Sequence, residues 1–143
     1  MSLDFEGKVA IVTGSGGGIG KGYALELAKR GAKVVVNDLG GAVDGSGGSL
    51  SAAEKVVQEI EAAGGEAIAN GANVCSEDDV KNMVKETMEK WGRVDILINN
   101  AGILRDKSFA KMEWSDFVTV VNVHLMGSAL CAHTVLSLIH ISE

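Results

Sequence analysis

The sequence predicts an α/β fold in which a parallel sheet is doubly wound, with helices covering both of its faces. Short, β-branched apolar runs alternate with segments whose apolar residues recur at helical spacing. The runs are apolar on successive residues, as in strands that are buried on both faces. Parallel strands need crossover connections, and these are usually helical and right-handed. A glycine-rich segment directly follows the first apolar run, at the place where such folds bind ligands.

Each element can be placed from this pattern. We expect four strands, the last of which runs into a loop, within residues 8–13, 32–38, 66–70 and 94–102. We expect helices over residues 19–30, 50–63 and 77–91, and a long helix from residue 112 onward. Ser76 can cap the third helix, whose first turn is acidic and whose apolar stripe we interpret as core. Together these elements predict a Rossmann-like domain.

The composition indicates a soluble protein with one domain of ordinary size. The chain has 143 residues, of which 46% are hydrophobic and 22% are charged. A net charge of −6 argues against nucleic acid as a partner, because phosphate backbones require a basic surface. We find no apolar run that approaches a membrane span, no signal-peptide layout, and no metal-ligand spacing at Cys75 and Cys131. We therefore expect no membrane span, no metal site and a reducing compartment.

The segment Thr13–Gly22 (TGSGGGIGKG) raises the question of which phosphate loop it forms. A helix that begins there presents unpaired N–H groups and its positive dipole end to an anion. The phosphate loop of nucleotide triphosphatases would need Gly at position 15 and a hydroxyl residue at position 22, but the chain has Ser15 and Gly22, so this loop is excluded. The spacing Gly-x-Gly-x-x-Gly is also excluded, because no register places all three glycines. The spacing that fits is Thr-Gly-x-x-x-Gly-x-Gly, at Thr13, Gly14, Gly18 and Gly20.

Asp38 ends the second expected strand, about 20 residues beyond the glycine segment, where an acid accepts hydrogen bonds from the adenosine ribose hydroxyls. A carboxylate there would repel the 2′-phosphate of NADP, and the next two residues, Leu39 and Gly40, are not basic. The sequence therefore favours NAD over NADP as the cofactor. The alternative is that Asp38 only caps a turn.

Two motifs together carry a resemblance to a known family. The segment TGSGGGIG and the segment NNAG at positions 99–102 resemble the short-chain dehydrogenase/reductase family, and the resemblance extends over residues 7–135. It implies that Asn73 and Val74 lie against the adenine, although the family more often has Asp at the first of these positions. The cofactor-binding residues that it implies are Thr13, Gly14, Ser15, Gly18, Ile19, Gly20, Asp38, Asn73, Val74, Asn99, Asn100, Ala101 and Gly102.

Within that family the chain is similar to the (3R)-hydroxyacyl-CoA dehydrogenase branch. The similarity rests on VVVNDLGG, on the Gly/Ser loop at 39–49 and on AGILRDKSFAKM. It implies an NAD-dependent oxidoreductase that acts on the hydroxyl or keto group of a 3-hydroxyacyl-CoA or a similar secondary alcohol. It also implies a homodimer or tetramer built through the helix near Met112, in the peroxisome of a eukaryote or the cytoplasm of a bacterium. Two alternatives remain open: a 3-ketoacyl reductase that uses NADPH, and a non-catalytic dinucleotide-binding module.

The resemblance also implies four catalytic residues: an Asn in the long helix, then a Ser, and a Tyr and Lys spaced Tyr-x-x-x-Lys. The place of the Asn, three residues before a Gly, is taken by His124, which either serves a proton relay or only packs in the helix. The only tyrosine is Tyr23, far from any catalytic place. We therefore expect the chain to hold the cofactor-binding half, truncated after the fifth helix, and to be inactive alone.

The segment LSLIHISE, at positions 136–143, does not resemble the family. This octapeptide is the translation of a transposase adapter that is common in sequencing libraries. We therefore expect residues 1–135 to be the N-terminal part of an NAD-binding domain and residues 136–143 not to be native, and we assign no function to His140. The alternative is a natural apolar helix end.

Overall fold

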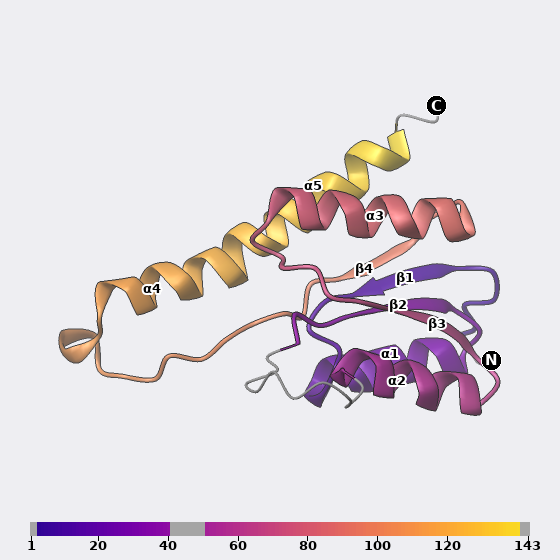
Figure 1. Ribbon diagram of the computed structural model, residues 1–143, viewed down its shortest axis with the longest axis horizontal. Helices are drawn as coiled ribbons and strands as arrows, with labels where there is room; N and C mark the ends of the chain where they lie inside the picture. Colours follow the sequence, from indigo (N-terminus) through magenta and orange to yellow (C-terminus); the bar gives the residue numbers. More distant parts are fainter. Residues whose placement is uncertain (1–2, 41–50, 141–143) are drawn as a thin grey trace.

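The computed structural model describes residues 3–40 and 51–140, and the four strands of this part form one parallel sheet (Figure 1). The strands are β1 (Val9–Val12), β2 (Lys33–Asn37), β3 (Glu66–Asn70) and β4 (Ile96–Ile98). Their order is β3-β2-β1-β4, and each neighbouring pair is parallel. The chain therefore moves outward from β1 to β3 and then returns to the other side of β1, which is the doubly wound arrangement. The predicted fold class is confirmed.

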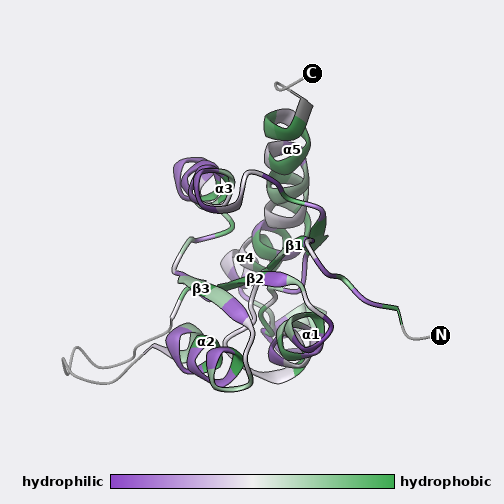
Figure 2. Ribbon diagram, turned by 90° about the vertical axis from the view of Figure 1, so that its right-hand side faces the viewer, coloured by the Kyte–Doolittle hydropathy of each residue, from purple (hydrophilic) through white to green (hydrophobic). Residues whose placement is uncertain are grey.

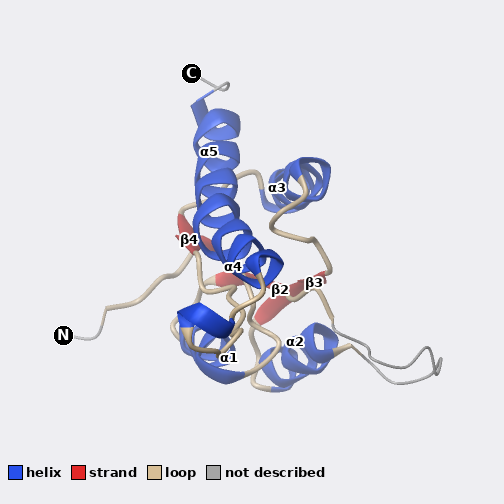
Figure 3. Cartoon of the chain, turned by 90° about the vertical axis from the view of Figure 1, so that its left-hand side faces the viewer, coloured by secondary structure: helices blue, strands red, loops and turns tan. Residues whose placement is uncertain are grey.

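Helices cover both faces of the sheet (Figures 1 and 3). One face carries α1 (Gly18–Lys29) and α2 (Ala52–Ala62). The other face carries α3 (Glu77–Trp91) and a long helix that consists of α4 (Trp114–Val121), the π-helical turn η2 (Asn122–Met126) and α5 (Gly127–His140). A short 3-10 turn, η1 (Phe109–Lys111), precedes α4. The predicted Gly/Ser loop falls mostly on residues 41–50, which lie outside the described residues.

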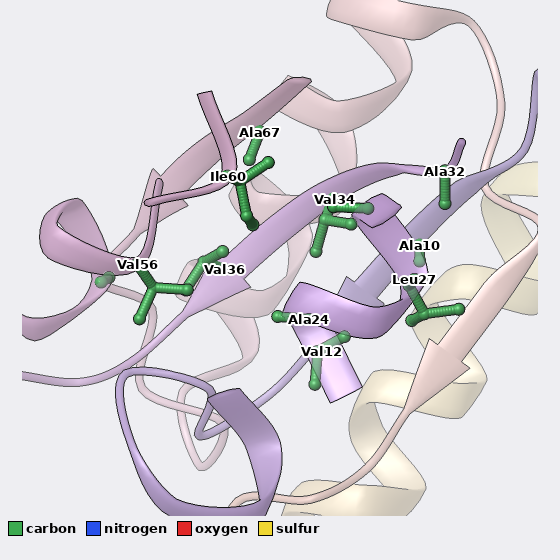
Figure 4. Close-up of a cluster of buried hydrophobic side chains, with 12 residues drawn as sticks. Ala10, Val12, Ala24, Leu27, Ala32, Val34, Val36, Val56, Ile60 and Ala67 are labelled. Atoms are coloured by element: carbon green, nitrogen blue, oxygen red, sulfur yellow. The ribbon is translucent and has the colours of Figure 1, made fainter. Parts of the chain in front are cut away.

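Burial of the sheet on both faces explains the unbroken apolar runs in β1 and β2. Alternate residues of these strands face α1 and α2, where they pack with Leu27, Val56 and Ile60 (Figure 4). The intervening residues Ile11 and Val35 belong to a second cluster with α3 and α5. Because successive side chains of a strand point to opposite faces, a strand covered on both sides needs apolar residues throughout.

The third helix begins and ends where the sequence predicts. The Ser76 hydroxyl accepts a hydrogen bond from the Asp79 N–H at 3.3 Å, and Gly92, at φ +73°, follows the last turn. The apolar stripe of α3 faces the second cluster, as expected of core packing. Its first four residues are buried and its last two are half-buried: Val80, Met83, Val84, Thr87, Met88 and Trp91.

The long helix begins at Trp114, two residues after the predicted start, because Met112 still has an extended backbone. The helix continues through α5 to residue 140, so residues 136–140 are helical. Their helical form follows from an apolar composition without Pro or Gly, and it does not bear on whether these residues are native.

This helix also bears on the expectation that the chain has no membrane span. Within the described residues, Trp114–Ile139 is long and apolar enough to cross a membrane, judged by length and composition only. Polar residues interrupt its apolar run. The finding is weak evidence of a span, since an apolar helix packed inside a soluble protein meets the same criteria. Figure 2 shows α5 as a largely hydrophobic helix beside the more polar α3.

Candidate functional site

The candidate site lies at the carboxyl ends of β1, β2 and β4, where three connecting segments meet. Because the strands are parallel, the segments that follow them leave the sheet at one edge. The Thr13 N–H donates to the Ile98 carbonyl oxygen at 3.0 Å, and the Ser15 N–H donates to the Asn37 carbonyl oxygen at 2.8 Å. The glycine segment is therefore held between the end of β4 and the end of β2.

Asn100 ties the loop after β4 to the glycine segment. Its Nδ2 donates to the carbonyl oxygens of Thr13 and Gly14, at 3.1 and 3.0 Å. In return, Oγ1 of the buried Thr13 accepts hydrogen bonds from the backbone N–H groups of Asn100 and Ala101, at 3.1 and 3.0 Å. The two motifs that carried the family resemblance are thus one hydrogen-bonded unit.

Two glycines of the motif are required by this close contact. Gly14 has φ +63°, and a Cβ atom there would lie 2.7 Å from the Ala101 Cα atom. A Cβ atom at Gly20 would lie 2.5 Å from the Gly14 carbonyl oxygen and would also meet the Asn100 side-chain amide. Any larger residue at either position would separate the glycine segment from the loop after β4.

The N-terminus of α1 is open to an anion. The hydroxyls of Ser51 and Ser76 cap α2 and α3, whereas in the described part of the chain no side chain caps α1, whose N-cap residue is Gly17. Gly18 and Ile19 at the start of α1 are exposed. The first N–H groups of a helix have no partner within the helix, and the helix dipole adds positive potential there. The arrangement fits a phosphate group.

The Ser15 side chain lies on the inner side of the glycine segment. Its hydroxyl is fully buried and donates to the Val12 carbonyl oxygen at 2.7 Å. It also lies 3.4 Å from the Asn37 carbonyl oxygen. The Ser15 side chain therefore supports the turn from inside and faces the sheet.

Asp38 lies beside the glycine segment with both carboxylate oxygens engaged. Oδ2 accepts a hydrogen bond from the Gly16 N–H at 3.1 Å, and Oδ1 accepts one from the Gly40 N–H at 2.9 Å. The Asp38 N–H donates to the Asn70 carbonyl oxygen at 3.0 Å, which extends the pairing of β2 with β3. The structure therefore places a half-buried negative charge next to the open end of α1.

The segment after β3 brings Asn73 and Val74 to the same edge of the sheet. The Asn73 side chain is bonded locally, since its Oδ1 accepts from the Cys75 N–H at 2.9 Å. The Asn73 N–H donates to Asp79 Oδ2 at 3.0 Å. Val74 is buried against Gly127 of α5, where a Cβ atom would lie 2.8 Å from its Cγ2.

Asn37 is a residue of the site that the sequence analysis missed. It is buried, and its Nδ2 donates to Asn70 Oδ1 at 3.1 Å and to the Ala72 carbonyl oxygen at 3.0 Å. These bonds join the carboxyl ends of β2 and β3. The available signal was an amide directly after three valines in β2, because a polar group buried there needs hydrogen-bond partners.

The loop after β4 also contacts the long helix. Asn99 is exposed, and its Nδ2 donates to the Ser128 carbonyl oxygen at 3.3 Å. His124, within the π-helical turn, has Nε2 at 3.0 Å from the Ile103 backbone N and 2.9 Å from its carbonyl oxygen. The imidazole also covers Gly102, where a Cβ atom would lie 2.5 Å from His124 Cε1. His124 therefore holds the backbone of this loop, by donating or accepting according to its tautomer.

The glycine segment, Asp38 and the NNAG loop are thus assembled at one edge of a parallel sheet. The family model described as short chain dehydrogenase matches residues 8–142. The chain belongs to the short-chain dehydrogenase family. The predicted family is confirmed, and with it the interpretation of the protein as an oxidoreductase by family.

Similar proteins extend this finding. The chain is 60% identical over 128 residues to the peroxisomal multifunctional enzyme A of Dictyostelium discoideum, a match that covers 90% of the chain and 28% of that protein. It is 54% identical over 126 residues to the peroxisomal hydratase-dehydrogenase-epimerase of Saccharomyces cerevisiae, which covers 88% of the chain and 14% of that protein. The chain therefore spans less than a third of these relatives.

A similar solved structure is a 7α-hydroxysteroid dehydrogenase complexed with NADH and 7-oxo glycochenodeoxycholic acid. It matches with a TM-score of 0.81 and 36% identity, over 92% of this chain and 48% of that chain. That similar dehydrogenase was solved with NADH, which agrees with a nicotinamide dinucleotide as the cofactor of the family.

Proposed function

We propose that this chain is the cofactor-binding half of an NAD-dependent dehydrogenase that interconverts a 3-hydroxyacyl-CoA and a 3-ketoacyl-CoA. The observation that carries the proposal is the Asp38 carboxylate, held beside the glycine segment in a member of a dehydrogenase family. A carboxylate there accepts hydrogen bonds from ribose hydroxyls and repels a 2′-phosphate. The substrate class follows the resemblance given in the sequence analysis, and the dehydrogenase activity is supported by the identity to two peroxisomal multifunctional proteins, one of which is named as a dehydrogenase.

The residues of this chain would hold the dinucleotide at three points. The N–H groups at the start of α1 would bind the pyrophosphate, and Asp38 would bind the adenosine ribose. Asn73 and Val74 would lie against the adenine. NAD, when bound, would supply the acceptor for a hydride from the substrate carbon that carries the hydroxyl group. The hydrogen bonds between Thr13 and Asn100 would keep the loop after β4 in place beside the cofactor.

Proton transfer from the substrate hydroxyl would depend on residues that the family resemblance implies and that have no match in these 143 residues. The only tyrosine is Tyr23, in α1, and no Tyr-x-x-x-Lys is present. We therefore expect the polypeptide of 143 residues to bind NAD without oxidising substrate.

The experiment is a spectrophotometric assay with a 3-hydroxyacyl-CoA and either NAD or NADP. The longest native polypeptide that contains residues 1–135 should reduce NAD in preference to NADP, and the 143-residue polypeptide should reduce neither. A preference of the longer polypeptide for NADPH and a 3-ketoacyl thioester would favour the reductase alternative. Binding of NAD without any turnover by the longer polypeptide would favour a non-catalytic module.

The proposal includes the origin of residues 136–143 as adapter sequence. The test is to amplify the source DNA across the codon for Val135 and to read onward. A frame that continues into a serine-bearing strand and a Tyr-x-x-x-Lys motif would support an adapter origin. A native stop codon after the codon for Glu143 would contradict it.

We also propose that the protein forms a homodimer or tetramer through the long helix. The apolar side chains of Trp114, Leu125 and Met126 are more than half exposed, at 67%, 64% and 56%. Soluble proteins rarely leave apolar side chains exposed together in this way unless a partner covers them. Sedimentation equilibrium of the longest native polypeptide should give twice or four times the monomer mass, and a monomer would contradict the proposal. By analogy with the two relatives, we expect a peroxisomal location in a eukaryote. A cytoplasmic location in a bacterium remains a prediction from the sequence alone.

A further inference from the structure

Gly16 is the point where the glycine segment comes closest to Asp38. Its backbone N–H donates to Asp38 Oδ2 at 3.1 Å, while the Gly40 N–H donates to Oδ1 at 2.9 Å. The carboxylate is therefore held from two sides, once by the segment after β1 and once by the segment after β2. A carboxylate has about four acceptor positions, so both oxygens can still accept further hydrogen bonds.

The space at Gly16 admits no side chain. A Cβ atom there would lie 2.6 Å from Asp38 Oδ2, 2.7 Å from Asp38 Cγ and 2.9 Å from the Cβ atom of Ala52, the first residue of α2. All three distances are below 3.0 Å, which real Cβ atoms essentially never show. A methyl group would therefore displace the carboxylate or move the glycine segment away from it.

The backbone conformation does not explain the glycine at this position. Gly14 and Gly18 have positive φ angles of +63° and +56°, but Gly16 is not among the positive-φ residues. The phosphate-loop spacing also leaves Gly16 unexplained, because that spacing specifies only positions 13, 14, 18 and 20. The remaining explanation for a glycine at position 16 is the close approach of its backbone to Asp38 and Ala52.

We propose that Gly16 is a positioning residue that fixes the Asp38 carboxylate and so determines the preference for NAD over NADP. This inference rests on the proposed function, in which Asp38 binds the adenosine ribose. A fixed carboxylate presents acceptors to the ribose hydroxyls and keeps its charge where a 2′-phosphate would lie. Displacing it weakens NAD binding and relieves the repulsion of NADP, so the two affinities move in opposite directions.

The test measures equilibrium binding of NADH and NADPH to the longest native polypeptide that contains residues 1–135. Gly16→Ala should lower the ratio of the NADPH dissociation constant to the NADH dissociation constant about tenfold, which is about 1.4 kcal/mol. Gly22→Ala is the matched control, because Gly22 lies in α1, outside the site, with nothing within 4 Å of its Cβ position. It should leave the ratio unchanged.

A double-mutant cycle separates positioning of Asp38 from a general effect on the glycine segment. If Gly16 acts through Asp38, Gly16→Ala should change the ratio in wild type and not in an Asp38→Ala background. An equal change in both backgrounds, or an equal loss of NADH and NADPH affinity, would overturn the inference. Should Gly16→Ala fail to fold, the variant Gly16→Ala with Ala52→Gly removes the contact to α2 and keeps the contact to Asp38.

The NADH and NADPH affinities of the wild-type protein separate a failure of the proposed NAD dependence from a failure of the Gly16 inference alone. A wild type without preference for NADH would overturn the proposed NAD dependence and this inference with it. A wild type that prefers NADH and keeps its ratio in Gly16→Ala would overturn the inference alone.

Discussion

Val9 and Asp95 are joined by two hydrogen bonds at the amino ends of β1 and β4. The Val9 N–H donates to Asp95 Oδ2, and the Asp95 N–H donates to the Val9 carbonyl oxygen, each at 2.9 Å. Arg93 Nε and Nη2 donate to the two carboxylate oxygens, at 2.8 and 2.7 Å. The Arg93 hydrogen bond holds the pKa of the Asp95 carboxyl below its usual range; partial burial opposes this shift, and the Val9 N–H bond adds to it.

Asp95→Asn should lower the free energy of unfolding by about 1 kcal/mol at neutral pH, because an amide loses the charge-assisted bonds to Arg93. In the unfolded chain this carboxyl has a pKa of about 3.9, above its folded-state value. The stabilisation is therefore present above about pH 4 and is lost as the pH falls through the folded-state pKa. Urea unfolding at neutral and acidic pH should show a shallower pH dependence for the variant.

Glu89→Gln is the control for Asp95→Asn. Glu89 pairs with Lys85 at 3.8 Å, and both side chains are exposed. Such a pair contributes at most about 0.5 kcal/mol, so the control should unfold like wild type. The interpretation of Asp95 fails if Asp95→Asn matches wild type in stability at both pH values.

Asn100→Ala should lower the free energy of unfolding by about 2 kcal/mol, because it leaves the carbonyl oxygens of Thr13 and Gly14 without their side-chain donors. NADH binding should weaken as well, since the glycine segment loses its tie to the loop after β4. Asn99→Ala is the stability control: Asn99 is exposed and makes one bond of 3.3 Å, so a change within about 0.5 kcal/mol is expected. Equal destabilisation by both variants would contradict the role given to Asn100.

Gly14→Ala should lower the free energy of unfolding by at least about 1 kcal/mol, the cost of a left-handed backbone for an L-residue. The contact with the Ala101 Cα atom, at 2.7 Å from the Cβ position, adds to this cost. Gly22→Ala, in an open position of α1, should instead stabilise the protein by up to about 1 kcal/mol. Thermal unfolding followed by circular dichroism compares the two variants. A Gly14→Ala protein as stable as wild type would show that the loop after β4 adapts freely.

The sequence could predict the meeting of Thr13, Asp38 and Asn100 because all three follow strands of one parallel sheet. Parallel strands bring their carboxyl ends to the same edge, so the order of elements was sufficient. The strand of residues 66–70 was also predictable, because it is a short run bounded by Gly65 and Gly71. The start of α3 was predictable from Ser76, which caps the helix. These features depend on local residue types and spacing.

The direction of individual side chains could not be predicted in the same way. Ser15 stands within the cofactor motif, yet its hydroxyl bonds to Val12 behind the turn. Asn37 stands in an apolar strand, yet its amide organises the neighbouring strand end. The contact of His124 with Ile103 depends on how the π-helical turn packs across the loop after β4. The Asn37 and His124 contacts join residues at least 21 positions apart, and the Ser15 bond depends on how the turn folds back on β1; spacing along the chain does not encode either.

His124 offers a test between a polar role and a packing role. His124→Phe keeps a flat ring over Gly102 and removes the nitrogen that lies within 3.0 Å of the Ile103 backbone. If that hydrogen bond positions the loop, His124→Phe should lower kcat/KM about tenfold, as expected for the loss of one hydrogen bond of about 1.4 kcal/mol. His124→Asn, which restores the residue usual in the family, should lose less. Steady-state kinetics of the longest native polypeptide compare the three proteins. Wild-type kcat/KM in His124→Phe, with a loss in His124→Asn, would show that His124 only packs against Gly102.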